Sequence, residues 1–302
     1  MSDRPILASR TVTSADGTAV EYLSTGRGPG VIVVPGALTE AADLGGLAAL
    51  LAEAGHETHV VQRRGRGASG PQGASYGIER ECEDVAAVRA ATGARLLFGH
   101  SYGGLVALRA ACGDPGYEAV AVYEPGVSVD GSIPLGWIDR AGREVAAGAA
   151  FEAFVTFVRG VNPEQSGRLP RFLLKAVLRL AIPKKDLRRN LALMPQAVRE
   201  HAEVLRMEPR LADYRRIGAP VLLLRGKGQG GDRQVAALAR LEREIPRART
   251  AALPRLDHFA PEKKPEEVAA VLVPFLATRA PAASGRIAGQ RGGARPAGQE
   301  EA

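Results

Sequence analysis

The stretch that decides the fold is LLFGHSYGGLVAL, residues 96–108. An apolar run of strand length leads into Gly99-His100-Ser101-Tyr102-Gly103-Gly104, and the apolar residues that follow have helical spacing. The pattern G-x-S-x-G is typical of a sharp strand-to-helix turn that holds a serine hydroxyl above a sheet. An ordinary glycine-rich turn is the alternative, because short motifs recur by chance in a chain with 36 glycines. The other motifs of the chain are therefore needed to distinguish the nucleophile turn from the ordinary glycine-rich turn.

Strand and helix signals alternate on both sides of this turn. Before it, they predict a hairpin over 11–23, strands at 31–34 and 57–61, and helices over 44–54 and 78–91. After it, they predict strands at 119–123, 220–225 and 249–253 and helices over 232–245 and 265–277. Between 127 and 214 the strand signals stop, and prolines separate several helices. This order predicts an α/β fold with a mostly parallel central sheet flanked by helices and an inserted helical cap.

The same pattern predicts the domain boundaries. We expect a core formed by residues 1–126 and 215–278, interrupted by the cap at 127–214. Residues 279–302 are rich in Gly, Pro and Ala and lack apolar periodicity, so we expect a disordered tail there.

Composition indicates a large globular protein. The chain has 302 residues, of which 45% are apolar, enough for a substantial core. Its start lacks the apolar segment of a signal peptide, and no later run has the length of a membrane span. We therefore expect a soluble cytoplasmic protein without a membrane span. Cys82 and Cys112 lack metal-site or redox spacing, so we expect them to be packing residues.

The positive charge of the chain is concentrated in one segment. The net charge is +7, and the segment 159–216 carries fourteen basic and six acidic residues. One interpretation is a solvated helical surface; the other is a field that attracts an anionic substrate or an anionic acyl carrier. Nucleic-acid binding is not expected, because the basic residues form no known reading motif and aromatic residues make up only 5% of the chain.

Four motifs in chain order carry a resemblance to a known family. They are Val33-Val34-Pro35-Gly36-Ala37, Arg64-Gly65-Arg66-Gly67-Ala68-Ser69, Gly99-His100-Ser101-Tyr102-Gly103 and Asp257-His258-Phe259, each behind a predicted strand. With these motifs the chain resembles the α/β-hydrolase superfamily over nearly all of residues 10–278. The resemblance implies the α/β-hydrolase fold, with Ser101 as nucleophile and His258 as general base and acid.

The resemblance also implies where an oxyanion would be held. One backbone N–H would come from Tyr102 and the other from Ala37, with Leu38 as the alternative. Pro35 stands where many relatives have histidine, but the donor is a main-chain group. The histidines outside the Asp257-His258-Phe259 motif are expected to be structural or exposed; they are His56, His59, His100 and His201.

Two residues are candidates for the acid that orients His258. Relatives usually carry it after the seventh strand, where residues 225–231 contain no carboxylate and Asp232 follows. Asp232 is also simply explained as a helix N-cap. Glu124 ends the sixth strand, at the edge where the site is expected, which favours it over Asp232. We expect Asp257 to cap its own loop.

These residues predict a serine hydrolase that cleaves a carboxylic ester, lactone or thioester of a small hydrophobic molecule through an acyl-enzyme. No metal, nucleotide or flavin motif is present, so no cofactor is expected. A non-catalytic small-molecule-binding protein of the same fold is one alternative. An acyltransferase or perhydrolase is another, because only the acyl acceptor would differ. No sequence feature indicates an oligomeric state.

Overall fold

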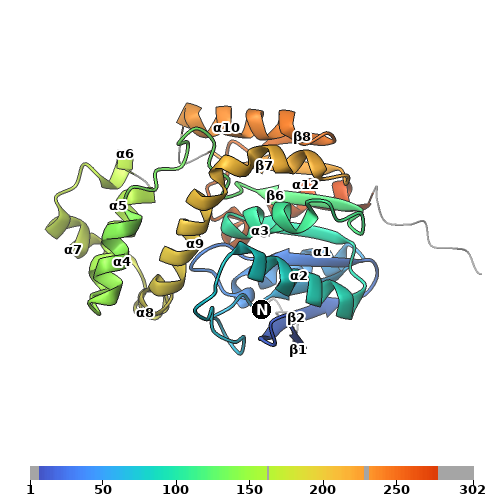
Figure 1. Ribbon diagram of the computed structural model, residues 1–302, viewed down its shortest axis with the longest axis horizontal. Helices are drawn as coiled ribbons and strands as arrows, with labels where there is room; N and C mark the ends of the chain where they lie inside the picture. The colour runs from blue at the N-terminus through green and yellow to red at the C-terminus, as the bar shows by residue number, and fades with distance from the viewer. Residues whose placement is uncertain (1–6, 162, 228–230, 278–302) are drawn as a thin grey trace, which may run out of the picture.

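A computed structural model describes residues 7–161, 163–227 and 231–277 (Figure 1). The expected tail at 279–302 lies outside these residues. The strands of the described part are β1 (Ala8–Thr13), β2 (Ala19–Gly26), β3 (Gly30–Val34), β4 (Glu57–Val61), β5 (Leu96–His100), β6 (Ala119–Tyr123), β7 (Val221–Arg225) and β8 (Ala248–Ala252). The helices are α1 (Gly45–Glu53), α2 (Ile78–Thr92), α3 (Tyr102–Ala111), α4 (Ile138–Ala146), α5 (Ala150–Val161), α6 (Pro163–Ser166), α7 (Arg171–Ala181), α8 (Lys184–Ala192), α9 (Met194–Met207), α10 (Gly231–Glu244), α11 (Ala260–Lys263) and α12 (Pro265–Ala277), with 3-10 helices η1 (Ala41–Leu44) and η2 (Glu208–Arg216).

The described strands form one sheet in the order β1-β2-β4-β3-β5-β6-β7-β8. β2 runs antiparallel to both of its neighbours, and the pairs from β4 to β8 are parallel. Side chains alternate between the two faces of each strand. In β3, Val31 and Val33 pack with α1 and α12, whereas Ile32 and Val34 pack with α2 and α3. The predicted α/β fold with a mostly parallel, helix-covered sheet is confirmed.

The helices between β6 and β7 lie beside the sheet rather than on it, at the left of Figure 1. We call residues 127–214 the helical insertion. Its buried apolar side chains include Trp137, Phe154 and Val204, and they belong to the same core cluster as α2 and α3. The insertion therefore packs against the core through shared apolar contacts. None of the described helices is long and apolar enough to cross a membrane.

The sheet register brings three loops together. Val34 of β3 pairs with Gly99 of β5, and His100 of β5 pairs with Tyr123 of β6. Parallel strands end at the same edge of a sheet, and ligand sites of open α/β sheets lie at that carboxyl edge. The residues that follow these strands, including Ser101 and Glu124, therefore meet there.

Candidate active site

Ser101 occupies a strained turn between β5 and α3. Its φ of 52° lies in the left-handed region, which few non-glycine residues adopt. A Cβ added to Gly99 would lie 2.3 Å from the carbonyl oxygen of Gly103, and one added to Gly103 would lie 2.1 Å from that of Val34. Both distances are far below van der Waals contact. Close backbone packing therefore requires glycine at both positions that flank the turn of Ser101.

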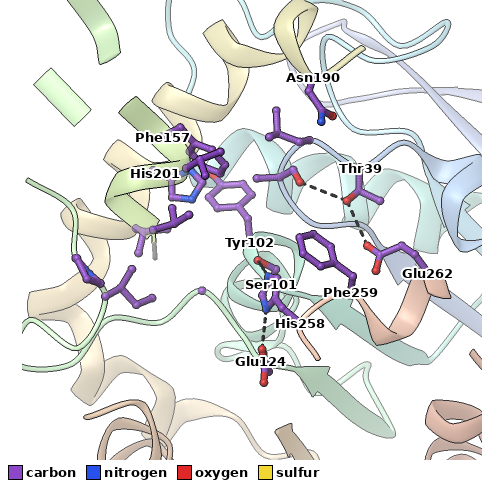
Figure 2. Close-up of a pocket in the computed structure, with 18 of the residues that line it drawn as sticks. Thr39, Ser101, Tyr102, Glu124, Phe157, Asn190, His201, His258, Phe259 and Glu262 are labelled. Carbon is purple, nitrogen blue, oxygen red and sulfur yellow. Dashed lines mark hydrogen bonds and ion pairs between the residues drawn. The ribbon is translucent and has the colours of Figure 1, made fainter. Parts of the chain in front are cut away.

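His258 connects this serine to a carboxylate. It lies in the loop between β8 and α11, and its Nε2 is 3.1 Å from Ser101 Oγ. Its Nδ1 is 2.7 Å from Glu124 Oε2, and Figure 2 shows the three side chains in line. The carboxylate can only accept at neutral pH, so Nδ1 carries the proton and the lone pair of Nε2 faces the serine hydroxyl. This tautomer is the one needed to take a proton from Ser101.

Glu124 is held as a buried anion. Its side chain is only 1% exposed. Burial by itself would raise the pKa of its carboxyl group, but the hydrogen bond and charge of His258 and the N–H of Gly226 outweigh burial and lower that pKa. Gly226 N donates to Oε1 at 2.9 Å. The loop after β7 therefore supplies a backbone donor, and the carboxylate comes from the end of β6.

The other two carboxylates considered from the sequence do not occupy this position. Asp232 is exposed at the start of α10, on the rim of the same cavity. Since Nδ1 of His258 is bonded to Glu124, the geometry leaves no orienting role for Asp232 there. Asp257 Oδ1 accepts a hydrogen bond from Phe259 N at 2.9 Å, the loop-capping contact that we expected.

The two expected oxyanion donors line the cavity that contains Ser101. Tyr102 begins α3, and the first N–H groups of a helix have no partner within it. Arg63 donates to the carbonyl oxygen of Gly36 at 3.1 Å. In a trans peptide the next N–H, that of Ala37, points the opposite way, away from Arg63. Leu38, the alternative donor, has a φ of 58°.

Three buried arginines follow β4, and their role was missed in the sequence. Arg63, Arg64 and Arg66 are each at most 2% exposed. Glu200 of α9 contacts Arg63 at 2.9 Å and Arg66 at 2.8 Å. Burial would raise the pKa of Glu200, but both arginines lower it. Arg64 pairs with Asp84 at 2.7 Å. Arg63 thus links the loop after β3 to the helical insertion, and Arg66 adds a second contact to Glu200.

His100 supports the catalytic histidine candidate from behind. Its Nε2 is 2.8 Å from the carbonyl oxygen of His258, and the two rings lie 4.9 Å apart. Its Nδ1 is 3.1 Å from Glu262 Oε1, and Glu262 also accepts from Thr39 Oγ1 at 3.3 Å. The contact of Nε2 holds the backbone of His258, which is consistent with the structural role expected for His100.

The cavity above Ser101 has a volume of about 1220 Å³. Its far wall comes from the helical insertion and is largely apolar, whereas Thr39, Asn190 and Glu262 add polar groups (Figure 2). Arg189, another lining residue, is neutralised by Asp43 at 2.8 Å. Within the described residues no cluster of potential metal ligands occurs.

His201 was expected to be structural or exposed, and in the structure it also lines this cavity, beside Phe157. Its Nδ1 is 2.7 Å from the carbonyl oxygen of Ala197, so Nδ1 carries the proton and Nε2 is a hydrogen-bond acceptor. The ring meets Trp137 and Phe157 edge to face. Removal from bulk water lowers the pKa of His201 and so favours this neutral form.

Comparison with known proteins adds to this geometry. A family model described as the alpha/beta hydrolase family matches residues 31–271. The crystal structure of an alpha/beta hydrolase from Sphaerobacter thermophilus is 30% identical, with a TM-score of 0.74, over 88% of this chain and 100% of that one. The crystal structure of E-2-(acetamidomethylene)succinate hydrolase, 22% identical, shares the fold with a TM-score of 0.62 over 90% of this chain and 99% of that one.

A curated relative gives a shorter match. N-formylmaleamate deformylase of Pseudomonas putida is 39% identical over 126 residues, which are 39% of this chain and 46% of that protein. The match thus spans less than half of the relative's length. Because the family match extends from β3 through the insertion to the loop of His258, and a relative at 30% identity covers most of the chain, the protein belongs to the alpha/beta hydrolase family.

Proposed function

We propose that this protein is a serine hydrolase that cleaves an acyl group from a small molecule through an acyl-enzyme intermediate. The observation that carries the proposal is the continuous hydrogen-bonded chain from Ser101 through His258 to Glu124, opening into a cavity of about 1220 Å³. A serine hydroxyl is a weak nucleophile until a base removes its proton, and this chain supplies the base and its orienting anion.

The mechanism follows from the positions of these groups. Ser101 Oγ attacks the substrate carbonyl carbon while His258 Nε2 takes its proton, and Glu124 stabilises the imidazolium that forms. The N–H groups of Tyr102 and Ala37 bind the oxyanion. His258 then protonates the leaving group, which departs and leaves an acyl group on Ser101. Water, deprotonated by His258, then attacks this ester; the bond to Ser101 Oγ breaks, the carboxylic acid leaves, and His258 returns a proton to the serine.

The substrate class we favour is a carboxylic ester, lactone or thioester of a small, largely apolar molecule. Apolar side chains of the insertion line much of the cavity, which supports an apolar acyl or ring group. In this proposal the insertion acts as a cap over Ser101. A second candidate is an N-acyl bond, because the curated relative is named N-formylmaleamate deformylase. The same nucleophile and oxyanion donors serve both bond types.

The test is covalent labelling of the full chain with a fluorophosphonate, followed by assay of short and medium p-nitrophenyl esters and of an N-formyl amide. We expect wild-type protein to be labelled and Ser101→Ala to be unlabelled. Ser132→Ala is the matched control, because Ser132 lines the same cavity but is far along the chain from the turn. Unlabelled but folded wild-type protein would favour the non-catalytic binding protein. Faster turnover with alcohols or peroxide than with water would favour the acyltransferase or perhydrolase.

His201 adds a specific expectation about the substrate. Since Nε2 of its neutral ring is an acceptor in the cavity, it suits a substrate that carries an N–H or O–H donor. His201→Phe keeps an aromatic ring and removes the acceptor. We expect it to lower kcat/KM about tenfold or more for esters with such a donor and to leave esters without one nearly unchanged. An equal loss for both ester classes would contradict this role.

A further inference from the structure

The outward face of α7 is unusually apolar for a protein surface. Seven large hydrophobic side chains are strongly exposed in the described part of the chain, and four of them lie on this helix. They are Phe172 (76% exposed), Leu173 (41%), Val177 (41%) and Leu180 (88%). Contiguous exposed apolar patches are uncommon on soluble monomeric proteins, and the larger ones often mark interaction sites.

Helix geometry places three of these four side chains on one stripe, and Phe172, which precedes Leu173, lies at its edge. Residues spaced by three or four positions share a face of a helix, as Leu173, Val177 and Leu180 do. Leu174 and Leu178 are on the opposite face and are buried in the core cluster, at 3% and 9% exposed. The inner face therefore already holds α7 on the protein, and the outer stripe is not needed for folding.

Basic side chains surround the stripe. The segment 168–189 contains eight basic residues and one acidic residue, Asp186. Arg171 and Lys175 form ion pairs with Glu152 on the inner side. The exposed basic residues of this segment are Arg168, Arg179, Lys184, Lys185 and Arg188. The outer surface of α7 and the first turn of α8 thus combines an apolar stripe with a positive rim.

The stripe lies at the end of the molecule farthest from the sheet, where α7 is the outermost helix at the left of Figure 1. The corner that joins it to α8 also lines the cavity, through Ala181, Ile182 and Pro183. A flat partner could therefore reach the stripe without meeting the sheet, and it would lie next to one wall of the cavity.

We propose that the outer face of α7 and the first turn of α8 bind the surface of an anionic phospholipid bilayer. An amphipathic helix with an apolar stripe and flanking basic residues lies in the plane of a membrane, with the apolar side chains among the acyl chains and the basic ones at the headgroup phosphates. The binding is peripheral and reversible. It requires none of the proposed catalytic chemistry.

The combination of positive charge and apolar surface on this face disfavours a second copy of the chain or an acyl carrier as its partner. In a symmetric dimer the same basic surface of each copy would meet its partner, and like charges would repel. An acidic acyl carrier would satisfy the basic rim but would leave the apolar stripe in water. A bilayer with anionic headgroups satisfies both features at once.

The test is sedimentation of the full chain with phosphatidylcholine vesicles that contain or lack phosphatidylglycerol. We expect binding only to the anionic vesicles and weaker binding at high salt. Two variants, Phe172→Asp with Leu180→Asp and Lys184→Glu with Lys185→Glu, should each weaken binding about tenfold or more. The matched control is Arg10→Glu with Arg27→Glu, two exposed arginines on the β1–β3 part of the core, which should bind nearly as wild type.

Two further measurements separate vesicle binding from folding and from catalysis. Circular dichroism checks that each variant is folded, and Ser101→Ala should bind vesicles like the wild type, so failure of the hydrolase proposal leaves this one standing. The proposal is overturned if wild-type protein ignores anionic vesicles, or if the control weakens binding as much as the α7 variants. It is also overturned if the wild type is a dimer that Leu180→Asp dissociates, since a second copy would then cover the stripe.

Discussion

The position of Glu124, the acid of the candidate triad, depends on the register in which β5 pairs with β6. His100 pairs with Tyr123, so the residues that follow, Ser101 and Glu124, leave neighbouring parallel strands at the same level. Glu124 also adopts a positive φ of 42°, a conformation that is uncommon outside glycine. The backbone turn and the Gly226 N–H together aim its carboxylate at His258.

This geometry predicts different outcomes for two conservative substitutions. Glu124→Gln removes the negative charge that orients and stabilises the His258 ring, so we expect kcat for ester hydrolysis to fall by about 10³ to 10⁴. Asp232→Asn changes an exposed residue and should alter kcat by less than about threefold. Steady-state kinetics of both variants measures the difference. A larger loss in Asp232→Asn would mean that His258 changes partner during turnover.

Close packing at the turn gives a second prediction. In Gly103→Ala, the new methyl group would lie 2.1 Å from the Val34 carbonyl oxygen and 2.4 Å from that of Pro35, so the oxyanion loop has to move. We expect the free energy of unfolding to fall by about 1–3 kcal/mol and labelling of Ser101 to be largely lost. Gly136→Ala is the control, because its methyl group would meet nothing within 4 Å. Urea unfolding and fluorophosphonate labelling test the pair; normal labelling of Gly103→Ala would refute the argument.

At the scale of elements, α9 links the helical insertion to the sheet by a buried charge. Glu200 is fully buried between Arg63 and Arg66, which belong to the loop after β4. A buried ion pair adds little stability compared with an apolar contact, but removing one partner leaves the other charge uncompensated. This carboxylate therefore adds a buried charged contact to the apolar contacts that join the insertion to the core.

We predict that Glu200→Gln lowers the free energy of unfolding by about 3–5 kcal/mol, because Arg66 loses its buried counter-charge and Arg63 keeps only its pair with Glu81. The comparison is Glu79→Gln, which breaks an exposed pair with Arg206 and should cost less than about 1 kcal/mol. Urea denaturation at neutral pH measures both. Similar losses in the two variants would show that the buried pair is not what anchors α9.

Sequence patterns predicted the elements better than their contacts. The strand β7 and the helix α10 were expected at nearly the residues where they occur, because apolar periodicity is a local signal. The partner of Arg66 was not predictable, since Glu200 lies 134 positions away and charge alone does not identify a partner. Such pairs depend on how complete elements pack.

At the scale of the whole molecule, two buried histidines and one partly buried histidine predict sensitivity to mild acid. Desolvation lowers the pKa of His56, His59 and His201 from the ordinary value of 6.5. Below about pH 6.5 these histidines bind more protons in the unfolded chain than in the folded protein, so a falling pH favours unfolding. Their contribution to stability is therefore complete above that pH and is lost as the pH falls towards the lowered values.

We predict that the urea midpoint decreases between about pH 7.5 and about pH 5.5, because protons then bind to these histidines more tightly in the unfolded chain than in the folded protein. His201→Phe should show a smaller decrease than wild type, because one of the three groups no longer titrates. Circular dichroism during urea titration at the two pH values measures this. Identical midpoints for wild type at both pH values would contradict the prediction.

The sequence by itself determined the α/β order of the chain and the sharp turn at Ser101, and its resemblance to the family pointed to His258 among five histidines. These are properties of neighbouring residues and of motif order, which periodicity and turn chemistry record directly. Only the tertiary structure decided which carboxylate meets His258 and that His201 lines the cavity. It also decided that one face of α7 stays exposed. Such contacts are set by strand register and by the packing of elements far apart in the chain, and no local pattern encodes them.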